Sequence, residues 1–125
     1  MQNPKTIIVI AAFLLAIAVA AGAFGAHALK NTLSPERLET WQTAVQYHAW
    51  HALGLMLVAL IGAQFEIAIT WPASLIFTGI VIFSGSLYTL CLTGIGWLGA
   101  ITPIGGLAFI AGWVLFGFQV LKNDF

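Results

Sequence analysis

The sequence predicts an all-α integral membrane protein: a four-helix bundle in a single transmembrane domain covering residues 1–125. The composition is the first reason, because 61% of the residues are hydrophobic and 6% are charged, whereas a soluble domain has roughly 25% charged residues. The spacing of the charges is the second, because long uncharged runs separate them. A hydrocarbon core about 30 Å thick needs about 20 residues of helix. The runs do not alternate as barrel strands do, so we expect helices.

The balance of charges argues against some classes of function. Four Lys and Arg residues oppose four Asp and Glu residues, so the formal net charge is zero. No basic patch is present to neutralise phosphates, and we therefore expect no nucleic-acid partner. The sequence shows no catalytic set, so we expect no enzyme activity and no cofactor. Cys91 is the single cysteine and cannot form an intramolecular disulfide.

The first span is predicted at about residues 5–29. Between Thr6 and Leu29 the only ionisable side chain is that of His27. Pro4 suits the first helical turn, where its missing N–H would have no partner, and Asn3 is a good N-cap.

The second helix is predicted to begin at Pro35, after the N-cap Ser34, and is too long to be only a span. Its first part, at about residues 35–43, places an apolar stripe opposite charged and hydroxyl side chains. This pattern is typical of an amphipathic segment in the membrane interface. We therefore predict an interfacial segment at 35–43 and a span at 44–63.

The run from Ile67 to Leu121 contains no Lys, Arg, Asp, Glu or His. It is too long for one crossing, and a glycine-containing break near residues 93–102 divides it. We predict spans at about 72–92 and 103–121. Pro72 and Pro103 fall at their starts, and Thr102 is predicted to cap the last helix.

Small residues are predicted to bring the helices together, because lipid tails supply no hydrophobic drive for helix association. They recur at helical spacing in the first, third and fourth spans. The residues assigned to helix packing are Ala18, Gly22, Gly25, Ala26, Ser84, Gly85, Ser86, Ala108 and Gly112.

Four spans put both termini and the 64–71 loop on one side of the membrane, and residues 30–43 and 93–102 on the other. Most of the polar side chains at membrane depth gather near this second side. Ionisable groups inside a membrane are costly and by default suggest a functional site. The candidate ligand-binding residues are His27, Tyr47, His48, His51, Tyr88, Thr102, Gly105 and Gly106.

The residue types of this cluster are compatible with several kinds of site. Three imidazoles can ligate zinc or copper, but no carboxylate lies at the same depth and His48-x-x-His51 is a weak spacing signal. We therefore predict no metal site and favour histidines that join helices through hydrogen bonds. The turn at residues 102–106 offers helix N–H groups to a lipid phosphate or quinone carbonyl, or is simply a glycine-packed helix start. A proton path is not expected, because the other half of the bilayer offers no ionisable group except near Glu66.

Several motifs resemble those of a bacterial membrane-protein family called domain of unknown function 423, which is similar to eukaryotic transmembrane protein 256. They are GAFGAH at residues 22–27, Thr43-Ala44 with Tyr47 and His51, FSGSLY at 83–88, TPIGG at 102–106 and Gly112-Trp113. The resemblance covers nearly the whole chain. It implies four transmembrane helices and, in Gram-negative bacteria, an inner-membrane location. The family carries no assigned biochemical activity, and it typically has Gln where this chain has His48. Only His27 and His51 match the pattern, which argues further against a three-histidine metal site.

The sequence therefore predicts a small non-enzymatic protein of the bacterial cytoplasmic (inner) membrane. It is expected to act through helix contacts, either as a homo-oligomer or as an accessory subunit of a membrane-protein partner, with membrane lipid around it. The alternative is a protein that binds a lipid or quinone at the histidine and tyrosine cluster. Each side carries two basic side chains, so the α-amine is the only basis for predicting cytoplasmic termini.

Overall fold

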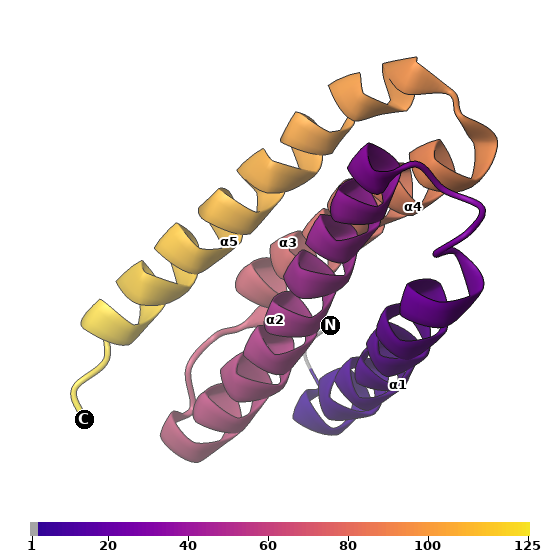
Figure 1. The fold of residues 1–125 in the computed structure, drawn as a ribbon. Coiled ribbons are helices and arrows are strands. Elements are labelled where there is room, and N and C mark those ends of the chain that lie inside the picture. The colour runs from indigo at the N-terminus through magenta and orange to yellow at the C-terminus, as the bar shows by residue number, and fades with distance from the viewer. Residues whose placement is uncertain (1–2) are drawn as a thin grey trace.

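The computed structural model describes residues 3–125, and these residues form helices and short connections without a strand. Figure 1 shows two long helices, α1 (Pro4–Ala28) and α2 (Pro35–Phe65), followed by a third built from several pieces. That third helix joins α3 (Thr70–Gly79), the π-helical turn η1 (Ile80–Ser84) and α4 (Gly85–Thr93). A short 3-10 helix, η2 (Gly96–Ala100), leads into α5 (Thr102–Leu121). Within the described residues, four helices are long and apolar enough to cross a membrane, which confirms the predicted fold class.

Two of the predicted helix caps are confirmed and one is wrong. The Asn3 side chain accepts a hydrogen bond from the Lys5 amide at 3.0 Å, and Ser34 Oγ accepts from the Arg37 amide at 3.2 Å. Thr102 does not cap α5, because the N-cap position belongs to Ile101, which makes no side-chain cap. The Thr102 hydroxyl is instead bonded to a neighbouring helix, as described below.

Residues 35–43 form the first turns of α2 and continue into residues 44–63 without a break. The predicted boundary at residue 44 therefore has no counterpart in the backbone, and the interfacial position of 35–43 stays a prediction. The helix ends at Phe65, and the C-cap residue Glu66 adopts a left-handed conformation with φ 54°. The next amide, that of Ile67, donates to the Gly62 carbonyl at 3.1 Å, which satisfies an end-of-helix acceptor.

The π-helical turn changes which residues of the third span face its neighbours. A π-turn inserts an extra residue into the helical repeat, so residues after it are rotated relative to a regular helix. Ser84 is 1% exposed, whereas a side chain at Gly85 would meet nothing within 4 Å. The prediction that Gly85 packs against another helix is therefore wrong, and Ser84 occupies the buried position.

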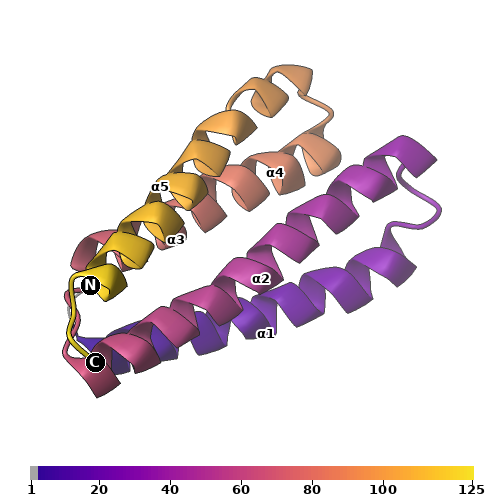
Figure 2. The ribbon, with the colours of Figure 1, turned by 90° about the vertical axis from the view of Figure 1, so that its left-hand side faces the viewer.

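The four spans form two antiparallel hairpins, α1 with α2 and α3–α4 with α5 (Figure 2). Helix α2 and the third span are the inner helices. In the apolar 18-residue stretch of each, 44% and 39% of the residues are buried. The corresponding value is 17% for both α1 and the span that ends with α5. The core between the inner helices includes Leu55, Val58, Ala73 and Ile76.

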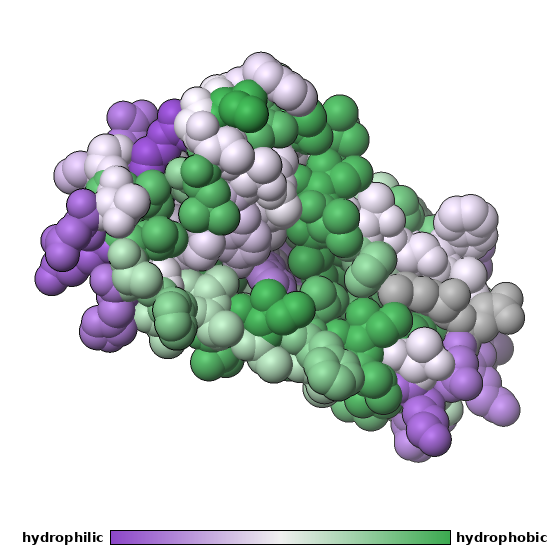
Figure 3. All heavy atoms as spheres, turned by 90° about the vertical axis from the view of Figure 1, so that its right-hand side faces the viewer, coloured by the Kyte–Doolittle hydropathy of each residue, from purple (hydrophilic) through white to green (hydrophobic). Residues whose placement is uncertain are grey.

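Both termini and the link between α2 and α3 lie at one end of the molecule, and the other two connections lie at the opposite end (Figure 2). This agrees with the topology that four successive crossings require. On the face drawn in Figure 3, hydrophilic residues gather toward the two ends and a hydrophobic band lies between them. The band is the surface expected to face lipid tails.

Candidate functional site

His48 is the most enclosed of the candidate polar residues. Its side chain is 3% exposed, and Nδ1 lies 2.9 Å from the Tyr88 hydroxyl. This hydrogen bond joins α2 to α4, and the Tyr88 ring also packs on Trp41 with centroids 4.7 Å apart. Nε2 of His48 is buried and has no hydrogen-bond partner among the described residues. The pair has the geometry of a structural link between helices, as the sequence predicted for its histidines.

His51 lies three residues further along α2 and packs against α5 instead. Its Nδ1 is 2.8 Å from the Tyr47 backbone oxygen. A carbonyl oxygen can only accept, so Nδ1 must carry the proton and donate it. In the neutral ring Nε2 then holds a lone pair and is an acceptor. The ring is half-buried and stacks on Phe109 with centroids 3.6 Å apart.

An aromatic cluster of His51, Tyr47, Phe83, Phe109 and Trp113 fills the space between α2 and α5. Tyr47 stacks against His51 at 5.9 Å, and Trp113 lies 6.0 Å from the same ring. The Trp113 ring occupies the space beside Gly54, where a Cβ would collide with it. Large side chains therefore separate α2 from α5.

Two hydroxyl contacts fix the third span against its neighbours. Ser84 Oγ donates to the Ala44 carbonyl of α2 at 2.8 Å. Ser86 Oγ lies 2.6 Å from Thr102 Oγ1, which ties α4 to the first turn of α5. Ser84 and Ser86 were predicted to pack as small residues, and the structure adds that both make hydrogen bonds.

The start of α5 is tightly packed at Gly105. A Cβ on Gly105 would collide with the backbone of Phe83, so this glycine allows α5 to approach the third span. Close packing therefore accounts for Gly105 without a ligand, and binding at residues 102–106 stays a prediction. Gly106 is half-buried, and a Cβ added there would lie 4.0 Å from the Phe83 ring, an ordinary van der Waals contact.

His27 is separated from the other two histidines. Its side chain is exposed at the end of α1, in a shallow depression lined by Ala23, Phe24 and Ala28. Position 27 follows the buried Gly25 by two residues, which is roughly 200° around a helix. The cluster predicted at this end of the bundle therefore divides into His48 with Tyr88, His51 with Tyr47, and His27 alone.

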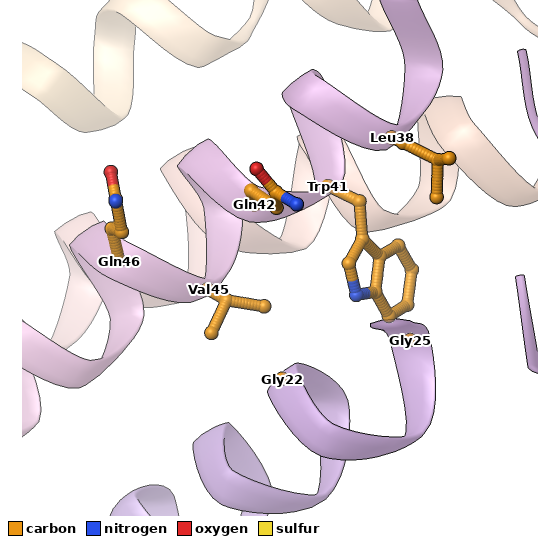
Figure 4. A pocket seen from close by; sticks show the side chains of 7 residues that line it. All are labelled: Gly22, Gly25, Leu38, Trp41, Gln42, Val45 and Gln46. Atoms are coloured by element: carbon orange, nitrogen blue, oxygen red, sulfur yellow. The ribbon is translucent and has the colours of Figure 1, made fainter. Parts of the chain in front are cut away.

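Glycines of α1 leave space that side chains of α2 fill. The Trp41 ring occupies the space beside Gly25, and its Nε1 donates to the Ala21 carbonyl at 2.9 Å. A Cβ at Gly22 would lie 3.3 Å from a Val45 methyl group. A groove runs along this contact, with Trp41 and Val45 pointing toward α1 and Gln42 and Gln46 on the α2 side (Figure 4).

The other predicted packing positions behave in different ways. Ala18 is 3% exposed, and Gly112 lies against Leu75 and Ile76 of α3. Ala108 is half-buried. The side chain of Ala26 lies outside the described part of the structure.

Sequence reasoning missed the contact that Arg37 makes at the start of α2. Its guanidinium Nη1 donates to the Leu90 carbonyl at 3.2 Å, and Cys91 Sγ donates to the Arg37 carbonyl at 3.3 Å. The pattern of residues 35–43 placed Arg37 only among the charged side chains opposite the apolar stripe, and its position opposite the end of α4 is what distinguishes it. Within residues 3–125, no three His, Cys, Asp or Glu side chains lie close enough to hold a metal ion.

These features define a small multi-pass membrane protein whose polar side chains mostly serve helix contacts. The chain belongs to the family described as protein of unknown function DUF423, whose model matches residues 21–106. The resemblance found in the sequence is thereby confirmed.

Similar proteins are found in Gram-positive bacteria. The UPF0382 membrane protein of Staphylococcus haemolyticus is 46% identical over 118 residues, covering 94% of this chain and 97% of the relative. The UPF0382 membrane protein YwdK of Bacillus subtilis is 45% identical over 120 residues, covering 94% and 98%. No solved structure matches the chain.

Proposed function

We propose that this protein acts through helix contacts within the membrane, as a homo-oligomer or as an accessory subunit of a membrane-protein partner. The observation that supports this is a row of exposed small residues on the face of α1 that points away from the bundle. Ala12, Ala16 and Ala20 recur every four residues and are all exposed, on the side opposite Ala11 and Ala18, which are buried. Small residues in this spacing let a second helix backbone approach closely.

Crosslinking in native membranes tests this proposal. In a Cys91→Ala background, Ala16→Cys should form a disulfide-linked dimer or a link to a partner protein on oxidation. Ala111 is an exposed alanine on the other outer helix, and Ala111→Cys is the matched control. A protein that stays monomeric, without a co-purifying partner, overturns the proposal.

Bulky substitutions give the complementary test. Ala16→Phe should disrupt the association, because the added ring prevents close backbone approach. Ala111→Phe should leave it intact. Equal loss in both variants would contradict an interface on α1.

The second candidate function is binding of a lipid or quinone, and the observation that favours it is the half-buried ring of His51, whose Nε2 makes no hydrogen bond within the described residues. The pair of Tyr47 and His51 presents one hydroxyl and one ring nitrogen beside flat aromatic walls. Such a small number of polar groups in an apolar setting is typical of a ligand site. Mass spectrometry of lipids extracted from purified protein tests it, and the absence of any enriched species would count against it.

For the orientation, we propose that both termini are cytoplasmic, in the bacterial cytoplasmic membrane. The two ends lie on one side of the bundle, so one reporter fused to the C-terminus decides the matter. An alkaline phosphatase fusion that is active outside the cytoplasm would overturn the proposal, and a fluorescent fusion active inside would support it.

A further inference from the structure

We infer that His51 binds a lipid that carries a free hydroxyl group, with the hydroxyl donating a hydrogen bond to Nε2. This rests on the second candidate function, lipid binding, and goes further by specifying the chemistry of the ligand. Three features support it: the tautomer of His51, the difference between His51 and His48, and the lipids that can supply a donor at this depth.

The tautomer comes from the partner of Nδ1. The Tyr47 carbonyl at 2.8 Å accepts and cannot donate, so Nδ1 holds the proton. Nε2 of the neutral ring is then an acceptor, and no donor among the described residues reaches it. A ligand that meets this atom must bring a hydrogen.

The two histidines of α2 differ in what surrounds Nε2. In His48 that atom is enclosed by protein, and the residue is 3% exposed. In His51 the ring is half-buried, and its neighbour Trp113 is 36% exposed. Nε2 of His51 also makes no hydrogen bond within the described residues, yet it is not enclosed as Nε2 of His48 is, so it keeps some surface that a ligand can reach.

The depth of His51 limits the donors available to it. It follows the exposed Gln46 by five residues, which is about 7 Å along a helix, and the adjacent Trp50 is 58% exposed. Indole rings prefer the headgroup region, so His51 lies in the outer part of the predicted span 44–63, below the headgroups. An acceptor in this apolar layer is unfavourable unless it is paired with a donor.

The parts of a phospholipid that reach this depth cannot supply that donor, since its ammonium or glycerol hydroxyl groups lie further out in the headgroup region. Acyl esters and phosphodiesters only accept hydrogen bonds at this level, and acyl chains offer none. An alcohol or phenol group on a lipid does supply it, and the same group can accept from the Tyr47 hydroxyl. The flat rings of Phe109 and Trp113 beside His51 suit the apolar part of such a molecule.

Two sources of this chemistry need to be separated: a phenolic lipid, such as a reduced quinone, and an aliphatic lipid alcohol, such as a diacylglycerol. The probes are a short-chain naphthoquinol against its quinone, and dioctanoylglycerol against trioctanoylglycerol. Each pair differs in the hydroxyl. The readout is the imidazole nitrogen-15 resonance of His51 during titration of the full-length protein in detergent micelles.

We expect the hydroxyl form of at least one pair to shift the Nε2 resonance saturably and to bind at least about tenfold more tightly than its partner, as a lost polar contact implies. The pair that responds identifies the source. In the variants of His51 and His27, binding is followed by the fluorescence of Trp113, which lies beside position 51. His51→Phe should remove the preference while keeping the ring stack, and His27→Phe should retain it. His51→Leu, which also lacks an acceptor, is the second variant if His51→Phe does not fold.

Equal affinity for both members of each pair, or a preference that survives in His51→Phe or His51→Leu, overturns the inference. Lipid binding without hydroxyl preference would leave the second candidate function standing and remove only this assignment. Failure of all four probes to bind, with no lipid enriched in the extract, removes both.

Discussion

The two faces of α2 pack against their neighbours in opposite ways. Toward α1, glycines make room for side chains of α2, and the Trp41 indole is fixed by its hydrogen bond to the Ala21 carbonyl. Toward α5, large rings fill the gap, and Trp113 has no such bond among the described residues and is 36% exposed. On the first face, the backbones of α1 and α2 lie close together. The second is bridged by side chains, of which Trp113 is partly exposed, and this is where a polar ring edge stays accessible.

The largest expected difference between the faces comes from matched glycine substitutions. Gly25→Val and Gly54→Val both add a side chain where a tryptophan ring lies, and both carry the same change in helix propensity. Gly25→Val should destabilise the protein by about 1–3 kcal/mol, a typical cost of overpacking, because Trp41 is anchored. Gly54→Val should cost less than half of that, because Trp113 can move toward lipid. Unfolding in mixed detergent micelles measures both, and equal losses would contradict the comparison.

A smaller difference is expected from the two tyrosines. Tyr88→Phe removes the hydroxyl that pairs with His48 Nδ1 and leaves a buried ring nitrogen without a partner. This should cost about 1 kcal/mol. Tyr47→Phe should change stability by less than about 0.5 kcal/mol, because the Tyr47 hydroxyl makes no hydrogen bond within the described residues. The same unfolding assay applies, and a Tyr47→Phe loss as large as that of Tyr88→Phe would mean that both faces are equally closed.

The smallest effect concerns the hydrogen bond that fixes the start of α5. A double-mutant cycle with Ser86→Ala and Thr102→Val should give a coupling of about 0.6 kcal/mol, the average for such bonds between membrane helices. Because the bond holds α5 near the third span, its loss should change the fluorescence of Trp113 and leave that of Trp41 unchanged. The two signals are separated by measuring single-tryptophan variants. A coupling indistinguishable from zero would remove this contact from the account.

The helices were predictable because charges and prolines mark where spans end. The apolar runs before Lys30, Glu66 and Lys122 are long enough to cross a membrane, and this needs no knowledge of packing. Cap assignment failed at Thr102, because the choice between capping its own helix and bonding Ser86 depends on where α4 lies. Local sequence does not contain that information.

The candidate site was only partly predictable for the same reason. Sequence could place His27, His48 and His51 near one end of the bundle, since topology alone decides this. It could not separate them, because their surroundings depend on rotation about the helix axis and on the π-turn of η1. The turn brings Ser84 rather than Gly85 to α2.

The most direct test of the account is the tautomer of the two α2 histidines, measured by nitrogen-15 imidazole resonances in the wild-type protein with His48→Gln and His51→Gln for assignment. We predict that His51 carries its proton on Nδ1, with Nε2 as an unprotonated nitrogen whose resonance shifts when a hydroxyl-bearing lipid is added. The resonances of His48 should stay unchanged by the same lipid. A proton on Nε2 of His51, or an equal response of both histidines, would contradict the distinction between a closed face and an open one.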